Sequence, residues 1–165
     1  MIREIITYTN KLLRTKSKDV EEFNSELHTL LDDMYETMIA ASGVGLAAIQ
    51  IAVPLNILII NPINEEDIQD KNDLIEAINP KITHKDGELV YQEGCLSVPG
   101  FYEDITRAKH IVVEYFDRFG EKQTMECEDF LAVAWQHEME HLDGHVFIEN
   151  LSKFSDMQEH FNCFL

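Results

Sequence analysis

The residues from His137 to His141 read His-Glu-Met-Glu-His, and this motif constrains the fold of the chain more than any other segment. On an α-helix, residues four positions apart lie on one face, so both imidazoles can reach a single metal ion. Glu138 lies beside them, where it can take a proton from water on the metal. The motif therefore predicts a helix with two metal ligands and a base, although two polar residues on an exposed helix face remain an alternative.

The segment before the motif, residues 129–135, is an almost uninterrupted apolar run with high helix propensity. We therefore expect a helix that is buried nearly all round. Histidine and glutamate need partners there, because an unpaired polar group in an apolar interior costs about 1 to 3 kcal/mol. A metal ion would satisfy these groups together, whereas histidines that are simply hydrogen-bonded in a core are the alternative.

The composition is that of a globular protein with one core. Of the 165 residues, 45% are hydrophobic and 27% are charged, which is ordinary for a water-soluble domain. We expect a single domain over residues 1–165. The formal net charge of −18 argues against a surface that binds nucleic acid or anionic lipid, because both carry negative charge.

The chain carries no signal for a membrane or for export. No segment approaches the ~20 consecutive apolar residues that span a bilayer, and the first residues lack the apolar core and cleavage site of a signal peptide. The three cysteines, Cys95, Cys127 and Cys163, are odd in number and widely spaced, which fits a reducing compartment. We therefore expect a cytoplasmic protein.

Hydrophobic periodicity predicts one amphipathic helix in the first third of the chain. It begins after Asn24, a candidate N-cap, and ends at about Ala41, before Gly43. Its apolar face includes Met34 and Met38, which we assign to the core. Its solvent face is formed by the acidic residues Asp32, Asp33 and Glu36.

Short apolar or alternating runs predict strands at residues 57–60, 75–78, 88–91, 111–116 and 122–127. A hairpin turn at residues 117–120 joins the last two, residues 64–73 form a surface loop, and a short amphipathic segment at 155–161 closes the chain. Several consecutive strands followed by one buried helix predict an α+β fold. In this fold, antiparallel β-sheets pack around the helix that carries the motif.

Two histidines leave a catalytic metal one protein ligand short, and the sequence offers several candidates. Glu159 lies 18 residues after His141, close to the spacing of thermolysin-like proteases. The metzincin pattern fails, because its third histidine would fall on Phe147 and His145 is two positions early. The remaining candidate is Cys95, in a Glu-Gly-Cys-Leu-Ser stretch that follows an expected strand.

Three short motifs together resemble those of the peptide deformylase family. Residues 43–50 read Gly-Val-Gly-Leu-Ala-Ala-Ile-Gln, residues 93–97 read Glu-Gly-Cys-Leu-Ser, and residues 136–141 read Gln-His-Glu-Met-Glu-His. They have the order and spacing of that family, and the resemblance extends to about residue 151. Glu140 stands where the family usually has Asp. We expect no long basic C-terminal helix of the kind that many bacterial deformylases use to dock on ribosomes.

The resemblance implies a metal held by Cys95, His137 and His141, with water in the fourth position. The expected metal is Fe²⁺, for which Zn²⁺, Ni²⁺ or Co²⁺ can substitute. Independently, a thiolate and two imidazoles suit Fe²⁺ or Zn²⁺, and three protein ligands leave the open position that catalysis requires. Glu138 would accept the proton of the attacking water.

The implied reaction is hydrolysis of the formyl group at the N-terminus of a new polypeptide, which yields formate and a free amino terminus. The Gln50 side-chain amide and the Leu96 backbone N–H would stabilise negative charge on the formyl oxygen. Val44 and Gly45 would lie alongside a substrate that binds as an added strand. An apolar pocket for the methionine side chain would be formed by Val44, Tyr91, Val133, Ala134 and His137, although ordinary core positions on the buried helix are the alternative for Val133 and Ala134.

Two further expectations concern residues around the metal ligands. Glu93 would face the charge of the metal site and pair with Arg107, as in the family, although a solvated loop acid is the alternative. Gly43 and Gly45 allow a positive φ or a close approach of the backbone. The expected partners are formyl-Met peptides and nascent chains, with no nucleic acid and no membrane, and we expect a monomer.

Two other functions remain open from the sequence. A zinc endopeptidase would use His137, His141 and Glu159 and would leave Cys95 idle. A non-catalytic domain with a structural metal would need four protein ligands, and the sequence shows no evident fourth.

Overall fold

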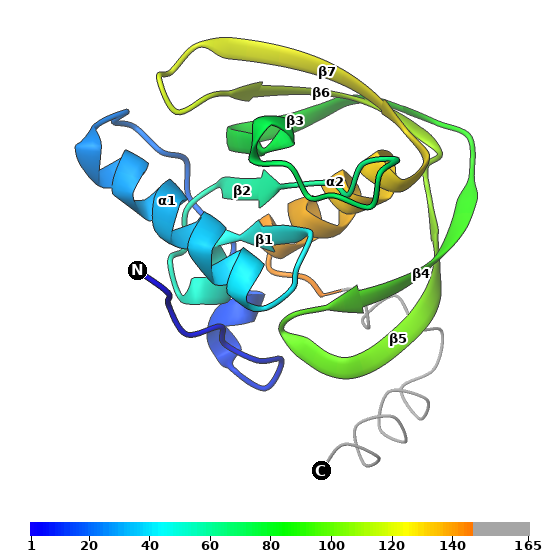
Figure 1. Cartoon of the computed structure of the whole chain (residues 1–165), viewed down its shortest axis with the longest axis horizontal. Coiled ribbons are helices and arrows are strands. Elements are labelled where there is room, and N and C mark those ends of the chain that lie inside the picture. The colour runs from blue at the N-terminus through cyan, green and yellow to red at the C-terminus, as the bar shows by residue number, and fades with distance from the viewer. Residues whose placement is uncertain (147–165) are drawn as a thin grey trace.

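A five-stranded antiparallel sheet and a separate β-hairpin lie on either side of one helix in the computed structural model, which describes residues 1–146 (Figure 1). The sheet has the order β1-β2-β3-β6-β7, and its strands are Gly45–Ala47, Ile57–Ile60, Ile75–Asp86, His110–Phe116 and Lys122–Glu128. The hairpin pairs β4 (Leu89–Cys95) with β5 (Val98–Arg107). The enclosed helix is α2 (Asp129–Leu142), so the predicted α+β fold around the motif helix is confirmed.

Helix α1 (Ser25–Ala40) begins directly after the predicted cap residue Asn24 and ends one residue before the predicted end at Ala41. The side chain of Asn24 accepts a hydrogen bond from the backbone N–H of Leu27, which satisfies one of the free donors of the first turn. At the other end, Ser42 has a φ of 56°, and the N–H of Gly43 donates to the carbonyl of Met38. The left-handed residue that ends the helix is therefore Ser42, and not the glycine that follows it.

One acidic residue of α1 is not on the solvent face. Asp32 and Glu36 are exposed, but Asp33 is buried. Its carboxylate accepts hydrogen bonds from Nε and Nη2 of Arg3 at 2.9 and 2.7 Å. The predicted solvent exposure of Asp33 is wrong, because periodicity identifies the face of a helix but does not show that an N-terminal segment crosses it.

Strand β2 is buried on both faces, and its four side chains have no exposed surface. Ile57 and Ile59 pack with the apolar face of α1, including Met34 and Met38, as predicted for these methionines. The alternate residues of β2 point to the other side of the sheet and pack with α2. This two-sided burial explains why the strand reads as a continuous apolar run.

The predicted strands are present, but two strands were not expected. Strand β3 continues to Asp86 and β4 to Cys95, beyond the predicted ends. Strands β1 and β5 were missed. In β5, Pro99 and Gly100 resemble a turn, yet proline is tolerated at the edge of a sheet, where its missing N–H leaves no ladder bond unmade. The predicted hairpin turn between β6 and β7 is confirmed, because the Asp117 side chain caps it.

Helix α2 follows β7 without an intervening loop and is packed against both the sheet and the hairpin. Trp135 has no exposed surface, and none of the residues 130–142 is exposed, which confirms the predicted burial. No helix within residues 1–146 has the length and apolar character needed to cross a membrane. The predicted segment 155–161, with Glu159, and also Cys163 lie outside the described residues.

Candidate active site

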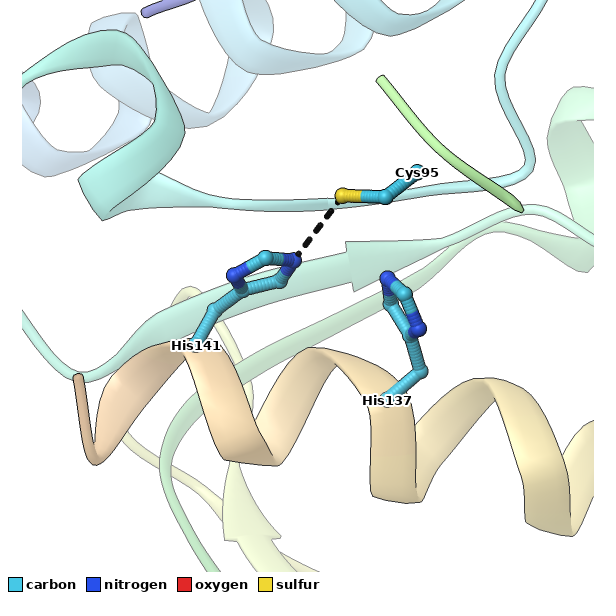
Figure 2. Close-up of side chains that lie close together, drawn as sticks. All are labelled: Cys95, His137 and His141. Carbon is cyan, nitrogen blue, oxygen red and sulfur yellow. Dashed lines mark hydrogen bonds between the residues drawn. The ribbon is translucent and has the colours of Figure 1, made fainter. Parts of the chain in front are cut away.

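Helix α2 and the end of β4 bring three sulfur and nitrogen donors together. His137 and His141 lie one turn apart, with ring centroids 5.0 Å apart, and both point toward Cys95 (Figure 2). The Sγ atom of Cys95 lies 3.3 Å from Nε2 of His141. The candidate ligand atoms of the three residues all lie within 4.8 Å of one another. The three residues predicted as metal ligands therefore form one cluster within residues 1–146.

The donor set fits a transition-metal ion. Ligand bonds of about 2.0 to 2.3 Å around a tetrahedral metal place the ligand atoms about 3.3 to 3.8 Å apart, and the Cys95 to His141 separation is close to this. Burial, followed by the charges of His137 and Arg107, holds the pKa of His141 well below its usual range, so its ring is neutral and has a free lone pair. Its Nδ1 atom is buried and has no hydrogen-bond partner among the described residues.

Glu138 brings a carboxylate into the same buried region. The residue is only 5% exposed, and its Oε2 atom has no hydrogen-bond partner within residues 1–146. Burial raises the pKa of this carboxyl from its ordinary value of 4.5 to about 7. A carboxyl group with this pKa can change its protonation state near neutral pH, as a general base must.

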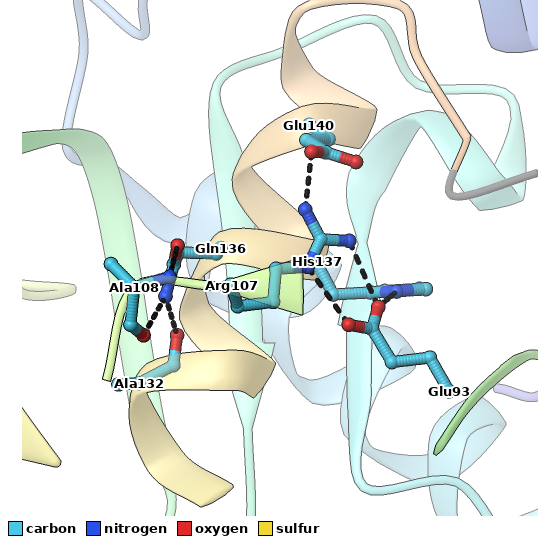
Figure 3. Close-up of polar contacts among 7 residues, drawn as sticks. All are labelled: Glu93, Arg107, Ala108, Ala132, Gln136, His137 and Glu140. Atoms are coloured by element: carbon cyan, nitrogen blue, oxygen red, sulfur yellow. Dashed lines mark hydrogen bonds and ion pairs between the residues drawn. The ribbon is translucent and has the colours of Figure 1, made fainter. Parts of the chain in front are cut away.

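A buried carboxylate fixes the orientation of one histidine. Oε1 of Glu93 lies 2.8 Å from Nδ1 of His137, and the same carboxylate accepts two hydrogen bonds from Arg107 at 2.8 and 2.9 Å (Figure 3). Burial alone raises the pKa of Glu93, but the bonds from Arg107 and His137 outweigh it and lower the pKa. The expected pairing of Glu93 with Arg107 is confirmed, and the alternative of a solvated loop acid is wrong. Because Glu93 holds the proton on Nδ1, metal binding would displace the proton on Nε2 of His137 and use that nitrogen as the ligand.

Polar contacts also fix α2 relative to β5. Nη1 of Arg107 donates a hydrogen bond to Glu140, so Arg107 lies between two carboxylates (Figure 3). The Gln136 amide accepts from the N–H of Ala108 at 3.0 Å and donates to its carbonyl at 2.8 Å. Gln136 also donates to the carbonyl of Ala132, one turn earlier. These contacts hold the helix against the end of the strand that supplies Arg107.

A buried amide lies on the other side of Cys95. The Oε1 atom of Gln50 accepts a hydrogen bond from the N–H of Ala47 at 2.9 Å, which fixes the direction of the amide. Its Nε2 atom donates to Oγ of Ser97 at 3.1 Å and lies 3.6 Å from Sγ of Cys95. The role of Ser97 as a hydrogen-bond partner of Gln50 was missed. Its only sequence signal is a polar side chain inside the Glu-Gly-Cys-Leu-Ser motif.

Two glycines permit close packing at the site. A Cβ atom at Gly45 would lie 2.7 Å from Oε1 of Glu138, and a Cβ atom at Gly43 would lie 2.6 Å from the Leu96 side chain. Neither glycine has a positive φ. Of the two reasons that the sequence offers for these glycines, close approach is the one that the structure supports.

The cluster opens into a cleft with a volume of about 490 Å³. Its lining includes every residue that the resemblance places next to the substrate, together with the candidate catalytic groups: Val44, Gly45, Gln50, Tyr91, Glu93, Cys95, Leu96, Val133, Ala134, His137 and Glu138. His141 lies behind this lining and has no exposed surface. The predicted substrate and catalytic positions therefore share one cleft.

Sequence reasoning missed an aromatic residue in the lining. The ring of Phe130 lies 5.6 Å from that of Tyr91, and both line the cleft. Phe130 precedes Val133, Ala134 and His137 by three, four and seven residues, so it lies on the same face of α2. This spacing was the available signal.

Comparisons with known proteins agree with this geometry. The polypeptide deformylase family model matches residues 2–157. A peptide deformylase of Campylobacter jejuni is 56% identical over 153 residues, which cover 92% of this chain and 87% of the relative. The crystal structure of a peptide deformylase from Legionella pneumophila has a TM-score of 0.89 at 40% identity and covers 96% of this chain and 90% of its own. A peptide deformylase from Ehrlichia chaffeensis in complex with actinonin has a TM-score of 0.86 at 39% identity, with coverages of 93% and 91%.

Proposed function

Because this chain belongs to the peptide deformylase family, it is a hydrolase that removes the formyl group from newly made polypeptides, and we propose that Cys95, His137 and His141 hold its catalytic metal. The observation that carries this proposal is the convergence of their ligand atoms beside the buried carboxylate of Glu138. A metal bound there would supply a Lewis acid that lowers the pKa of water and polarises the formyl carbonyl. The family is one of metalloenzymes, and Fe²⁺ is the ion that we propose for this chain.

Glu138 acts as the general base. Its pKa of about 7 suits it to accept a proton from the attacking water. Water adds to the formyl carbon, and Glu138 then returns the proton to the leaving nitrogen as the carbon–nitrogen bond breaks. The products are formate and a free amino terminus.

Gln50 and Leu96 stabilise the charge that develops on the formyl oxygen. The Gln50 amide is held by Ala47 and Ser97, with its NH₂ group next to Cys95. A preorganised donor of this kind typically contributes about 3 to 4 kcal/mol to transition-state stabilisation. The backbone N–H of Leu96, in the turn directly after Cys95, is the second donor that we propose.

The substrate peptide lies along β1. Within the described residues, β1 pairs only with β2, so its other edge is free to accept an added strand. Val44 and Gly45 lie at this edge and line the cleft. Backbone hydrogen bonds at the edge hold peptides of many sequences, which suits an enzyme that acts on newly made chains in general.

The methionine side chain of the substrate enters the apolar part of the cleft. Val133 and Ala134 form its wall on α2, and Tyr91 lies opposite, against Phe130. An unbranched, polarizable thioether fits such a space. Each buried methylene adds about 0.8 kcal/mol of favourable transfer free energy.

We propose that the enzyme is a cytoplasmic monomer, with residues 1–165 as one catalytic domain that acts on nascent chains. Zn²⁺, Ni²⁺ or Co²⁺ can replace Fe²⁺. The peptide deformylase from Ehrlichia chaffeensis forms a complex with actinonin, and we propose that the cleft of this chain also binds actinonin.

Formate release from formyl-Met-Ala-Ser, measured after anaerobic loading with iron, tests the proposal. The wild-type protein should release formate, and Cys95→Ala should release almost none. A Cys95 variant that kept normal formate release would show that this cysteine is not a required metal ligand. Cleavage of an internal peptide bond in an unformylated substrate would support the zinc endopeptidase alternative directly.

A further inference from the structure

A second group of metal-binding side chains lies on the five-stranded sheet. His84 and Asp86 belong to β3, and His110 belongs to β6. Asp86 pairs directly with His110 across the two strands, and His84 lies two residues earlier on the same face. The candidate ligand atoms of the three residues all lie within 4.8 Å of one another. Residues that are 24 or more positions apart in the sequence therefore meet on one surface.

This group lies on the face of the sheet that points away from α2. Ile111, Val113 and Cys127 are buried in the core with Trp135. Side chains alternate along a strand, so the neighbours of these residues, including His110, point outward. The sheet therefore separates the group from the deformylase site on α2, and a ligand bound to one does not contact the other.

One carboxylate oxygen connects the two imidazoles. Oδ2 of Asp86 lies 2.5 Å from Nε2 of His84 and 2.8 Å from Nδ1 of His110. The other ring nitrogen of His110, Nε2, lies 2.6 Å from Oε1 of Glu126 on β7. The ring of His110 is thus fixed by a carboxylate at each nitrogen, while the side chains of His84 and Asp86 remain about half exposed to solvent.

The contact with Glu126 is characteristic of a metal-ligating histidine. Such a histidine binds the metal through one nitrogen and donates its other N–H to a carboxylate, which fixes the ring orientation and the tautomer. His110 has this arrangement if Nδ1 faces the metal and Nε2 faces Glu126. A β-bulge in β3 directly precedes His84, and bulges commonly redirect a side chain.

We propose that His84, Asp86 and His110 form a second site for a divalent transition-metal ion such as Zn²⁺, Ni²⁺ or Cu²⁺, oriented by Glu126. Two imidazoles and one carboxylate suit these borderline ions, whereas Mg²⁺ and Ca²⁺ prefer oxygen ligands. Around a tetrahedral Zn²⁺ with bonds of 2.0 to 2.1 Å, ligand atoms lie about 3.3 Å apart. The nitrogen–oxygen distances in the structure are 2.5 and 2.8 Å. Side-chain movements of less than about 1 Å would increase them to the separation that a bound ion requires.

Calorimetric titration of Zn²⁺ into the full-length protein, with its active site already loaded with Zn²⁺, tests the proposal. The wild-type protein should bind one further ion with a Kd below about 100 µM. His84→Gln and His110→Gln should each weaken this binding more than about tenfold, and Glu126→Gln, which removes only the orienting carboxylate, about tenfold. The control variant His28→Gln removes an imidazole from α1, outside the proposed site, and it should bind the second ion with wild-type affinity.

Two further measurements locate the ion. Substoichiometric Ni²⁺ should broaden the amide NMR signals of residues 84–86, 110 and 126 in the Zn²⁺-loaded protein and leave those of α2 sharp. Formate release should stay within about twofold of the wild-type rate in all four variants, because the sheet separates the two sites. The absence of a second binding event, or its persistence in both histidine variants, would overturn the assignment. If a histidine variant failed to fold, Asp86→Asn would replace it with the same expected loss.

Discussion

The carboxylate of Glu138 occupies the space that a side chain at residue 45 would need, since a Cβ atom there would lie 2.7 Å from Oε1. We expect Gly45→Ala to displace this carboxylate and to lower kcat/KM by about 10² or more, which is the range for loss of a general base. The bound metal should remain. Gly43→Ala is the matched control, because its Cβ would press on the flexible Leu96 side chain instead, and its loss should be clearly smaller. Equal losses in the two variants would argue against the role of Glu138.

A second experiment distinguishes the role of the proposed base, Glu138, from that of the proposed metal ligand, Cys95. Glu138→Ala should keep one metal per chain and lose most activity, because Glu138 takes part in proton transfer and does not bind the ion. Cys95→Ala should lose both the metal and the activity. Elemental analysis, combined with formate release, distinguishes the two outcomes. Normal turnover of Glu138→Ala with metal bound would show that another group accepts the proton.

Substrate preference tests the apolar part of the cleft. The kcat/KM for formyl-Met peptides should be more than about tenfold higher than that for formyl-Gly peptides, because glycine has no side chain to bury against Val133 and Ala134. Phe130→Ala should narrow this difference by opening the wall next to Tyr91. Equal rates on the two wild-type substrates would remove the pocket assignment.

Metal substitution tests the proposed preference for iron. The anaerobically loaded Fe²⁺ form should be the most active form, should lose activity within minutes to hours in air, and should exceed the Zn²⁺ form. An iron ion next to the Cys95 thiolate can react with oxygen and oxidise that ligand, whereas zinc has no such redox step. Activity is compared before and after exposure to air. A Zn²⁺ form at least as active as fresh Fe²⁺ would reverse the preference and leave the hydrolytic roles unaffected.

The buried contact between Asp33 and the N-terminal segment should make stability depend on pH. Hydrogen bonds from the Met1 amino group and from Arg3 lower the pKa of Asp33 below its usual 3.8. A lowered carboxyl pKa contributes stability above the unfolded-state value, and this stability is lost as pH falls through the folded-state value. The denaturant concentration at the unfolding midpoint of the wild-type protein should therefore decrease when the pH is lowered below about 4. Asp33→Asn should be less stable near neutral pH and should show a smaller decrease on acidification.

The sequence predicts those features of this protein that depend on short stretches of chain. The cap at Asn24, the apolar run of β2 and the apolar residues before His137 each set the local structure where they occur. The three short motifs likewise pointed to residues that the structure gathers in one cleft. Their proposed chemical roles remain predictions that the variants above will test.

Other features depend on how distant segments meet, and short-range patterns do not contain this information. Asp33 is buried because Arg3 reaches it, and Ser97 matters because the amide of Gln50 comes within 3.1 Å. The pairing of Asp86 with His110 depends on strand register and on a bulge in β3. Burial and register are properties of the assembled sheet, so these contacts became visible only in the structure.

Strand β7 ends at Glu128 and helix α2 begins at Asp129, so no connecting residue lies between the two elements. An α-helix turns about 100° per residue. One amino acid inserted between these two positions would therefore rotate His137 and His141 by about that angle relative to the sheet, and would direct them away from Cys95 unless the helix unwound. We infer that the length of the chain at this junction is tightly constrained. The left-handed backbone of Asp129, with a φ of 55°, also restricts its replacement to residues such as Asn and Gly.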